Sequence, residues 1–153
     1  MEIIYHCFGG AHSSVTAAAI HLGMLPEESV PTSKQLIDTP FYDKQENDDH
    51  GTIKHIGTDN MGNEVYIVGR RGLDSDFETF LEDFMKLNKV QANLIIVGTL
   101  SGVNIYMRLG GYLSRKLRLT WIGRPLVLYG TKKAHMDFVK IVHQTKKQLE
   151  QEN

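Results

Sequence analysis

The fold class is decided by residues 2–23, which read EIIYHCFGGAHSSVTAAAIHLG. The first part, Glu2–Phe8, is a short apolar run typical of a buried strand, and it ends at two glycines. Ser13 and Ser14 are favoured at the start of a helix, and the alanine-rich segment after them favours a helix that stops near Gly23. The stretch therefore predicts a strand, a tight glycine turn and a helix.

The remainder of the chain continues this alternation. Thr52–Gly57 and Glu64–Gly69 alternate polar and apolar residues around a turn-forming segment, which predicts a β-hairpin. Asn93–Gly98 and Pro125–Gly130 are mostly apolar and predict buried strands. Helices are expected near residues 33–37, 74–87, 103–117 and 131–149, the second with an inward apolar face of Phe77, Phe80, Leu81, Phe84 and Leu87.

Strands that alternate with helices indicate an α/β domain. Right-handed crossovers make the strands at 2–8, 94–97 and 125–129 largely parallel and place helices on both faces of the sheet. We therefore expect a single α/β domain over residues 1–153. Its architecture should be three-layer and doubly wound, with a mainly parallel sheet of four or five strands and a β-hairpin insertion.

The composition excludes several classes of protein. The chain has 153 residues, one cysteine and 41% hydrophobic residues, with 17 Lys or Arg against 18 Asp or Glu. This fits one compact domain and excludes a disordered chain. A single cysteine cannot close an internal disulfide, which favours a reducing, cytoplasmic location. No signal-peptide pattern and no run long enough for a membrane helix is present, so no membrane partner is expected.

The near-neutral charge is a cancellation between two parts of the chain. Residues 1–100 carry a formal charge of −8, and residues 101–153 carry +7. Such a basic segment either meets RNA, nucleotide or an acidic partner, or consists of solvated helix faces. The second interpretation is favoured, and nucleic acid is not an expected partner, because no RNA-binding aromatic signature accompanies the basic residues. The sequence indicates no particular oligomeric state.

The glycine loop after the first strand is the leading candidate site. In doubly wound sheets, ligands bind at the carboxyl ends of the strands, where glycine loops and helix N-termini favour anions. Turns after the other strands are expected at the same edge, whereas Arg124 is expected at the opposite end. The predicted phosphate-binding residues are Gly9, Gly10, Ala11, Ser13 and Ser14 of the loop, with Arg70, Thr99, Ser101 and Thr131 from the other turns.

Three known phosphate loops can be compared with this segment. The P-loop requires a lysine and a glycine spacing that are absent here. The loop of low-molecular-weight tyrosine phosphatases matches at Cys7 and Ser14, but Ser13 stands where that family has its arginine. The loop resembles more closely that of cellobiose-type phosphotransferase-system IIB proteins, C-x-x-G-x-x-[ST]-S, through Cys7, Gly10, Ser13 and Ser14. That resemblance implies a phosphate held by backbone N–H groups without an arginine.

Two residues are candidates for catalysis. Cys7 is a nucleophile activated by the helix end and a histidine, or else a small buried hydrophobe. His12 is a phosphate-positioning group or an acid–base catalyst, or else a loop histidine bonded to the backbone. His6 and Cys7 are neighbours on a strand and should point to opposite faces, which disfavours a dyad between them.

A metal site is not expected. His6, Cys7, His12, His50 and His55 lack any recognised zinc-ligand spacing. No particular cofactor is indicated by any other motif.

The whole chain resembles a bacterial family of small proteins of unknown function. The segments that carry the resemblance are YHCFGGAHSSVTAAAIHLG at residues 5–23, LGGYLSR at 109–115 and IGRPLVLYGTKKA at 122–134. The resemblance covers most of the chain and implies a cytosolic protein of endospore-forming bacteria, with no activity and no catalytic residue to transfer.

The residues themselves favour binding of a phosphate-bearing small molecule or nucleotide, with phosphoryl transfer through Cys7 open. The alternative is a regulatory or protein-interaction module whose glycine loop is structural.

Overall fold

The computed structural model describes residues 1–45, 49, 51–73, 76–87, 93–115, 117 and 119–152. Its centre is a four-stranded sheet in the order β2-β3-β1-β4. The strands are β1 (Glu2–Cys7), β2 (Lys54–Thr58), β3 (Glu64–Gly69) and β4 (Leu94–Gly98). β1 pairs in parallel with both β3 and β4, and only β2 is antiparallel. The predicted α/β class with a mainly parallel sheet is confirmed.

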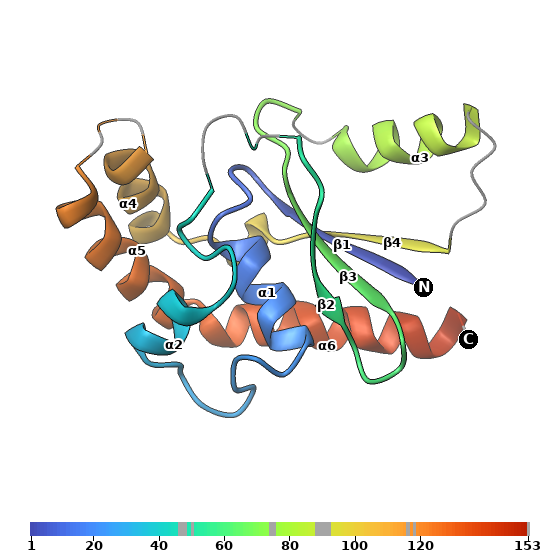
Figure 1. Cartoon of the computed structure of the whole chain (residues 1–153), viewed down its shortest axis with the longest axis horizontal. Helices are drawn as coiled ribbons and strands as arrows, with labels where there is room; N and C mark the ends of the chain where they lie inside the picture. Colours follow the sequence, from blue (N-terminus) through green and yellow to red (C-terminus); the bar gives the residue numbers. More distant parts are fainter. Residues whose placement is uncertain are drawn as a thin grey trace.

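The β-hairpin is present, but it is not an insertion. Its second strand, β3, lies beside β1 with Cys7 opposite Gly69, so it belongs to the parallel sheet. Only its first strand, β2, is an added edge. β1 is consequently flanked on both sides, and the ends of β3 and β4 lie next to its carboxyl end (Figure 1).

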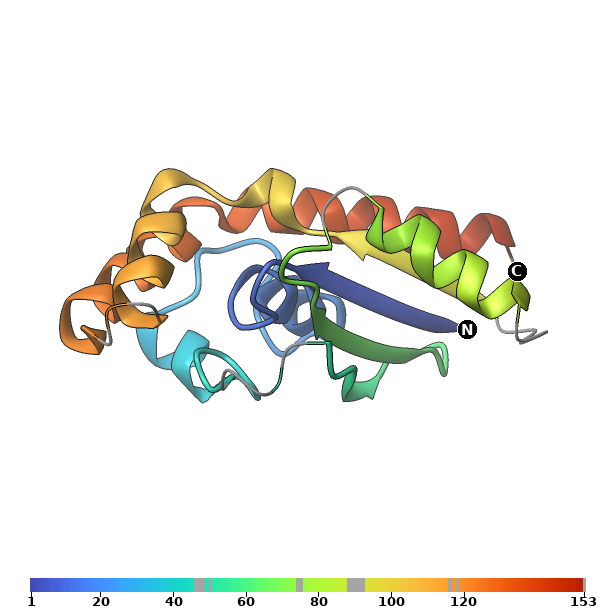
Figure 2. The same ribbon diagram turned by 90° about the horizontal axis from the view of Figure 1, so that it is seen from above.

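Helices cover both faces of the sheet (Figures 1 and 2). The helix α1 (Ser13–His21) and the long helix α6 (His135–Glu152) pack against each other and share a core with Ile3 and Tyr5 of β1. The alternate residue Ile4 packs on the other face, against Phe77 of α3 (Phe77–Leu87). The helices are α1 (Ser13–His21), α2 (Ser33–Asp38), α3 (Phe77–Leu87), α4 (Ile105–Arg115), α5 (Thr120–Lys133) and α6 (His135–Glu152), with a 3₁₀ turn η2 at Leu100–Gly102. None of these described helices is long and apolar enough to cross a membrane.

The predicted strand at 125–129 is wrong. This segment lies inside α5, which forms a helical hairpin with α4. Glycines bring the two helices together: a Cβ on Gly123 would lie 2.6 Å from the backbone N of Ser114. Val127 and Leu128 are buried and Tyr129 is exposed. Close packing with α4 therefore decides the structure of an apolar run that local pattern cannot assign to strand or helix.

The inward apolar face predicted for α3 is only partly correct. Phe77 is buried and Leu81 packs partly against the sheet, but Phe80, Phe84 and Leu87 are exposed. One helix on this face of the sheet cannot bury an apolar stripe that wide.

The other predicted helices agree more closely with the structure. α2 matches the expected helix at 33–37 and is held by a capping box between Thr32 and Gln35. The last predicted helix, 131–149, is divided between α5 and α6, so that Thr131 lies within α5. Three residues that enter the sequence predictions lie outside the described residues. They are Asp74 and Ser75, at the expected start of α3, and His50, one of the histidines considered as metal ligands.

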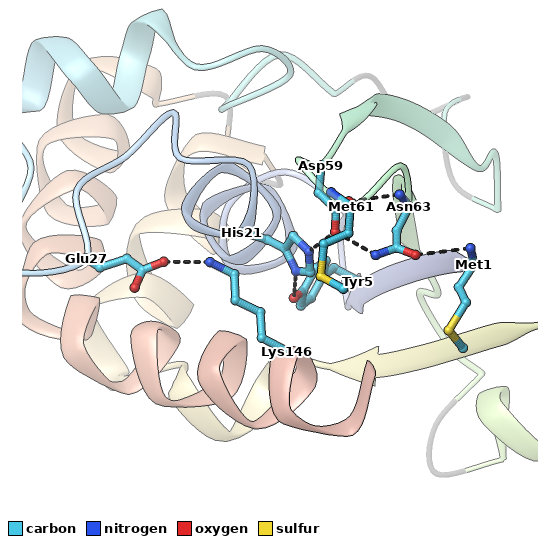
Figure 3. Close-up of polar contacts among 8 residues, drawn as sticks. All are labelled: Met1, Tyr5, His21, Glu27, Asp59, Met61, Asn63 and Lys146. Atoms are coloured by element: carbon cyan, nitrogen blue, oxygen red, sulfur yellow. Dashed lines mark hydrogen bonds and ion pairs between the residues drawn. The ribbon is translucent and has the colours of Figure 1, made fainter. Parts of the chain in front are cut away.

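A buried polar network connects Tyr5 of β1, through His21 of α1, to Asp59 in the turn between β2 and β3 (Figure 3). The Tyr5 hydroxyl lies 2.8 Å from His21 Nδ1, and His21 Nε2 lies 3.1 Å from Asp59 Oδ2. Burial lowers the pKa of His21 and so favours the neutral ring. Because the ionised Asp59 can only accept, His21 Nε2–H donates to it and Tyr5 O–H donates to Nδ1. The network is fully satisfied and stabilises the fold.

The close packing of α4 on α5 gives a stability prediction. Gly123→Ala should lower the free energy of unfolding by about 1–3 kcal/mol, because the new Cβ overlaps the backbone of Ser114. Gly111→Ala is the matched control: a Cβ there meets nothing within 4 Å, and alanine is the better helix former. Urea titrations that show equal effects of the two substitutions would contradict this packing.

The buried network predicts a pH-dependent stability. Burial raises the pKa of Asp59, but bonds from Asn63, His21 and Met61 outweigh it and lower the pKa from 3.8 to about 2. A carboxylate with a depressed pKa stabilises the fold above its unfolded pKa, and this contribution disappears as the pH falls through the folded value. Asp59→Asn should therefore destabilise the protein at neutral pH, and the difference should shrink between about pH 4 and pH 2. Asp83→Asn, at an exposed carboxylate of α3, is the matched control.

Candidate functional site

The candidate site is the turn from β1 into α1, which two glycines make unusually tight. Gly10 has a φ of +66°, a conformation that other residues rarely adopt. A Cβ on Gly10 would lie 2.7 Å from the backbone N of Gly69, and one on Gly69 would lie 2.8 Å from the carbonyl carbon of Gly9. The loop therefore lies against the end of β3 and brings the start of α1 back over the end of β1.

This turn places the Cys7 sulfur among hydrogen-bond donors. The backbone N–H of Gly10 donates to Sγ at 3.0 Å, and Ser14 Oγ lies 3.2 Å from Sγ. Burial raises the pKa of the Cys7 thiol, but hydrogen bonds from Ser14, Ser13 and Gly10 outweigh this effect and leave the pKa below its ordinary value. These hydrogen bonds therefore favour the thiolate form of Cys7. The residue is buried, with 5% of its surface exposed.

The end of β4 completes the buried part of the site. Thr99 N–H donates to the carbonyl oxygen of His6 at 3.0 Å, which ties the end of β4 to that of β1. The Thr99 hydroxyl donates to the same carbonyl at 2.9 Å and lies 3.0 Å from Ser13 Oγ. The hydroxyls of Ser13 and Ser14 thus lie beside Cys7 at the carboxyl edge of the sheet, and that of Thr99 lies beside Ser13.

The rim of the loop carries a second polar cluster. His12 Nε2 lies 3.1 Å from Asp43 Oδ1, and Arg124 Nε donates to Asp43 Oδ2 at 2.7 Å. Burial raises the pKa of Asp43, but His12 and Arg124 outweigh it and lower the pKa to about 2. Because the ionised carboxylate only accepts, His12 Nε2–H donates to it. The N–H of Asp43 also donates to the carbonyl of Ala11 at 3.0 Å, so the segment around Asp43 is bound directly to the glycine loop.

Two arginines follow β3 beside the loop. The backbone N–H of Arg70 donates to the Cys7 carbonyl at 2.9 Å, and that of Arg71 donates to the Phe8 carbonyl at 2.8 Å. The guanidinium of Arg70 donates to the Leu73 carbonyl, whereas the Arg71 side chain is exposed. Both residues therefore lie next to the loop, as expected for a strand parallel to β1.

His6 points away from this cluster, as strand alternation predicts. Its Nε2 lies 2.9 Å from Glu78 Oε1, and its ring packs against Phe77 of α3. Burial lowers the pKa of His6. Cys7 faces α1 instead, so the two side chains do not form a dyad.

The structure thus sorts the predicted residues into three groups. Cys7, Gly10, Ser13, Ser14 and Thr99 lie together, with Gly9, Ala11, His12 and the backbone of Arg70 around them. Ser101 is exposed in η2. Thr131 was expected to follow a strand, but it lies within α5. Its hydroxyl is 2.8 Å from that of Tyr42.

Sequence reasoning missed Asp43 and assigned Arg124 to the wrong end of the sheet. The error on Arg124 follows from reading residues 125–129 as a strand, since α5 carries Arg124 to the loop. The spacing of Gly123 and Gly130, seven residues apart and both buried against α4, was the available signal for a helix. Among the described residues, no group of three or more His, Cys, Asp or Glu side chains could hold a metal ion.

Comparison with known proteins identifies one family. A family model described as "Protein of unknown function (DUF3189)" matches residues 2–147. No curated protein matches the chain, and no solved structure does.

The donors around Cys7 predict a measurable change in its ionisation. Ser14→Ala should raise the pKa of the Cys7 thiol, because it removes a hydroxyl that stabilises the thiolate. The pH dependence of thiolate ultraviolet absorbance gives the midpoint, with Cys7→Ser as the blank. Ser33→Ala on α2 is the matched control. A midpoint that Ser14→Ala leaves unchanged would show that the hydroxyl does not stabilise the thiolate.

Proposed function

This chain belongs to the DUF3189 family, which is described as of unknown function, and we propose that its loop Gly9–Ser14 binds the phosphate group of a small molecule or nucleotide. The observation that supports this proposal most directly is the convergence of donors on the Cys7 sulfur. A set of N–H and O–H groups that holds a thiolate at a helix N-terminus suits the oxygens of a bound phosphate equally well.

The position of the loop in the sheet supports the same function. β1 lies between β3 and β4, and the chain reaches those two strands in succession on opposite sides of it. In open α/β sheets such a switch point, at the carboxyl ends of the strands, is where ligands bind. The glycines of the loop let the backbone approach a ligand closely.

Cations near the loop supply the charge that the loop itself lacks. A phosphate group is bound most strongly by charge-assisted hydrogen bonds, and arginine can provide two at once. Arg71 is exposed beside Phe8, and Arg124 is held by Asp43 with its side chain half-exposed. These two residues are the candidates for phosphate neutralisation in our proposal, alongside the loop N–H groups.

Phosphoryl transfer is the reaction that this arrangement would permit. The Cys7 thiolate would attack phosphorus, forming a sulfur–phosphorus bond and breaking the bond from phosphorus to the leaving oxygen. The leaving oxygen would take a proton from a general acid, and His12 at the rim is our candidate. Water would then hydrolyse the thiophosphate ester and restore the thiol.

A ligand screen tests the proposal. The thermal unfolding midpoint should rise on addition of inorganic phosphate, nucleotides or sugar phosphates, because a ligand that binds only the folded state stabilises it. Cys7→Ser and Ser13→Ala should reduce the rise, since both change the donor cradle. Arg71→Gln should also reduce it, whereas Lys140→Gln, which removes an exposed charge on α6, should not.

Equal ligand-induced shifts in the wild type, Cys7→Ser and Ser13→Ala would place the binding elsewhere and contradict the proposal. Absence of a shift with every phosphate compound would favour the alternative, a non-catalytic interaction module. That alternative is supported by a separate observation, the large apolar side chains exposed on α3, α4 and α5.

A further inference from the structure

The carboxylate of Asp43 holds two side chains at the rim of the glycine loop, and it holds each of them by a single nitrogen. Arg124 donates to Oδ2 through Nε at 2.7 Å, and His12 donates to Oδ1 through Nε2 at 3.1 Å. Among the described residues, the terminal nitrogens of Arg124 and the Nδ1 of His12 have no hydrogen-bond partner. These nitrogens are therefore open to a ligand.

Asp43 is itself fixed on both sides. Its backbone N–H donates to the carbonyl of Ala11 in the loop at 3.0 Å. The neighbouring Tyr42 is buried, and its hydroxyl lies 2.8 Å from that of Thr131 in α5. The Asp43 side chain is 10% exposed, whereas that of Arg124 is 49% exposed. Asp43 is therefore the anchored partner, and Arg124 is the side chain that it orients.

The backbone around Asp43 has an uncommon conformation. Phe41 has a φ of +64° and Asp43 a φ of +53°, in the left-handed region that residues other than glycine seldom adopt. Such conformations persist only where surrounding contacts impose them, and they are concentrated at ligand-binding and catalytic sites. Here they bring the Asp43 carboxylate between the loop and α5, which is the arrangement that a functional role for the carboxylate requires.

The way in which Asp43 holds Arg124 suits a second anion. A guanidinium is planar and presents several donors in a fixed fork, so it can bind a carboxylate through Nε and a phosphate group through its terminal nitrogens. His12 belongs to the loop, so only the Asp43 carboxylate separates the Arg124 guanidinium from a loop residue. Arg124 is thus held next to the N–H groups that we propose to bind phosphate.

We propose that Asp43 is a positioning residue of the phosphate site and that the site takes a phosphate monoester. Asp43 holds Arg124 so that its terminal nitrogens bind two phosphate oxygens, while the N–H groups of the loop Gly9–Ser14 bind the third. A monoester has three oxygens that carry no ester group, whereas a diester has only two. Both parts of this proposal rest on the function proposed above for the loop.

Isothermal titration calorimetry with inorganic phosphate tests the role of Asp43. Asp43→Asn should weaken binding by about tenfold, because the amide tolerates the left-handed φ but removes the charge that holds Arg124. Arg124→Lys should lose nearly as much affinity as Arg124→Gln, because an ammonium group has no fork that binds carboxylate and phosphate together. Asp83→Asn is the matched control, since it removes the same charge from an exposed ion pair with Lys86.

A double-mutant cycle shows whether Asp43 acts through Arg124. In the Arg124→Gln background, Asp43→Asn should weaken phosphate binding much less than it does in the wild type. An equal loss in both backgrounds would show that Asp43 only supports the fold of the loop, and would overturn its positioning role. Urea titration of each variant verifies that the proteins compared are folded.

Methyl phosphate and dimethyl phosphate test the ligand class. The wild type should bind the monoester about tenfold more tightly or better, and Asp43→Asn should reduce this preference. Equal binding of the two compounds overturns the monoester assignment. A wild type that binds neither inorganic phosphate nor methyl phosphate contradicts the function of the loop itself, and the role of Asp43 with it. Phosphate binding that Asp43→Asn leaves unchanged or tightens overturns the role of Asp43 alone.

Discussion

The close approach of the glycine loop to the end of β3 is the contact on which the candidate site depends. At Gly10 and Gly69 the two backbones lie too near for any side chain, and Gly10 also has a left-handed conformation. This contact returns the chain at once from the end of β1 into α1. Without it the hydroxyl of Ser14 and the N–H of Gly10 could not both reach the Cys7 sulfur.

The same contact relates the loop to the rest of the molecule. The strand alternation of β1 sends His6 to α3 and Cys7 to α1, so the two faces of the sheet have separate polar environments. On the Cys7 side, Asp43 joins the loop to α5 by accepting from His12 and Arg124. The basic α4–α5 hairpin is therefore connected to the proposed phosphate site, while the acidic α3 lies on the opposite face.

Much of the fold and half of the site could be predicted from local pattern. The run Glu2–Phe8, the glycines and the alanine-rich helix carry strong and consistent local signals, and they place Cys7, Ser13 and Ser14 correctly. Thr99 followed from the parallel arrangement of β4 and β1.

The errors arose where tertiary packing, and not the local sequence, determines the secondary structure. The run Pro125–Gly130 favours a strand locally, but glycine-mediated packing on α4 makes it helical. Because of that one misassignment, Thr131 and Arg124 were predicted at the wrong positions relative to the sheet. The positions of Asp43 and Tyr42 depend on a loop whose residues Phe41 and Asp43 have positive φ, and no local pattern indicates that conformation.

Amide NMR is the sharpest test of whether the loop N–H groups and Cys7 form a phosphate site. Titration of ¹⁵N-labelled protein with inorganic phosphate should shift the amide resonances of Gly9 to Ser14, and should leave that of Gly62, in the turn between β2 and β3, unchanged. The same titration of Cys7→Ser should give weaker binding. If saturating phosphate leaves the amide resonances of Gly9 to Ser14 unmoved, the loop is not a phosphate site.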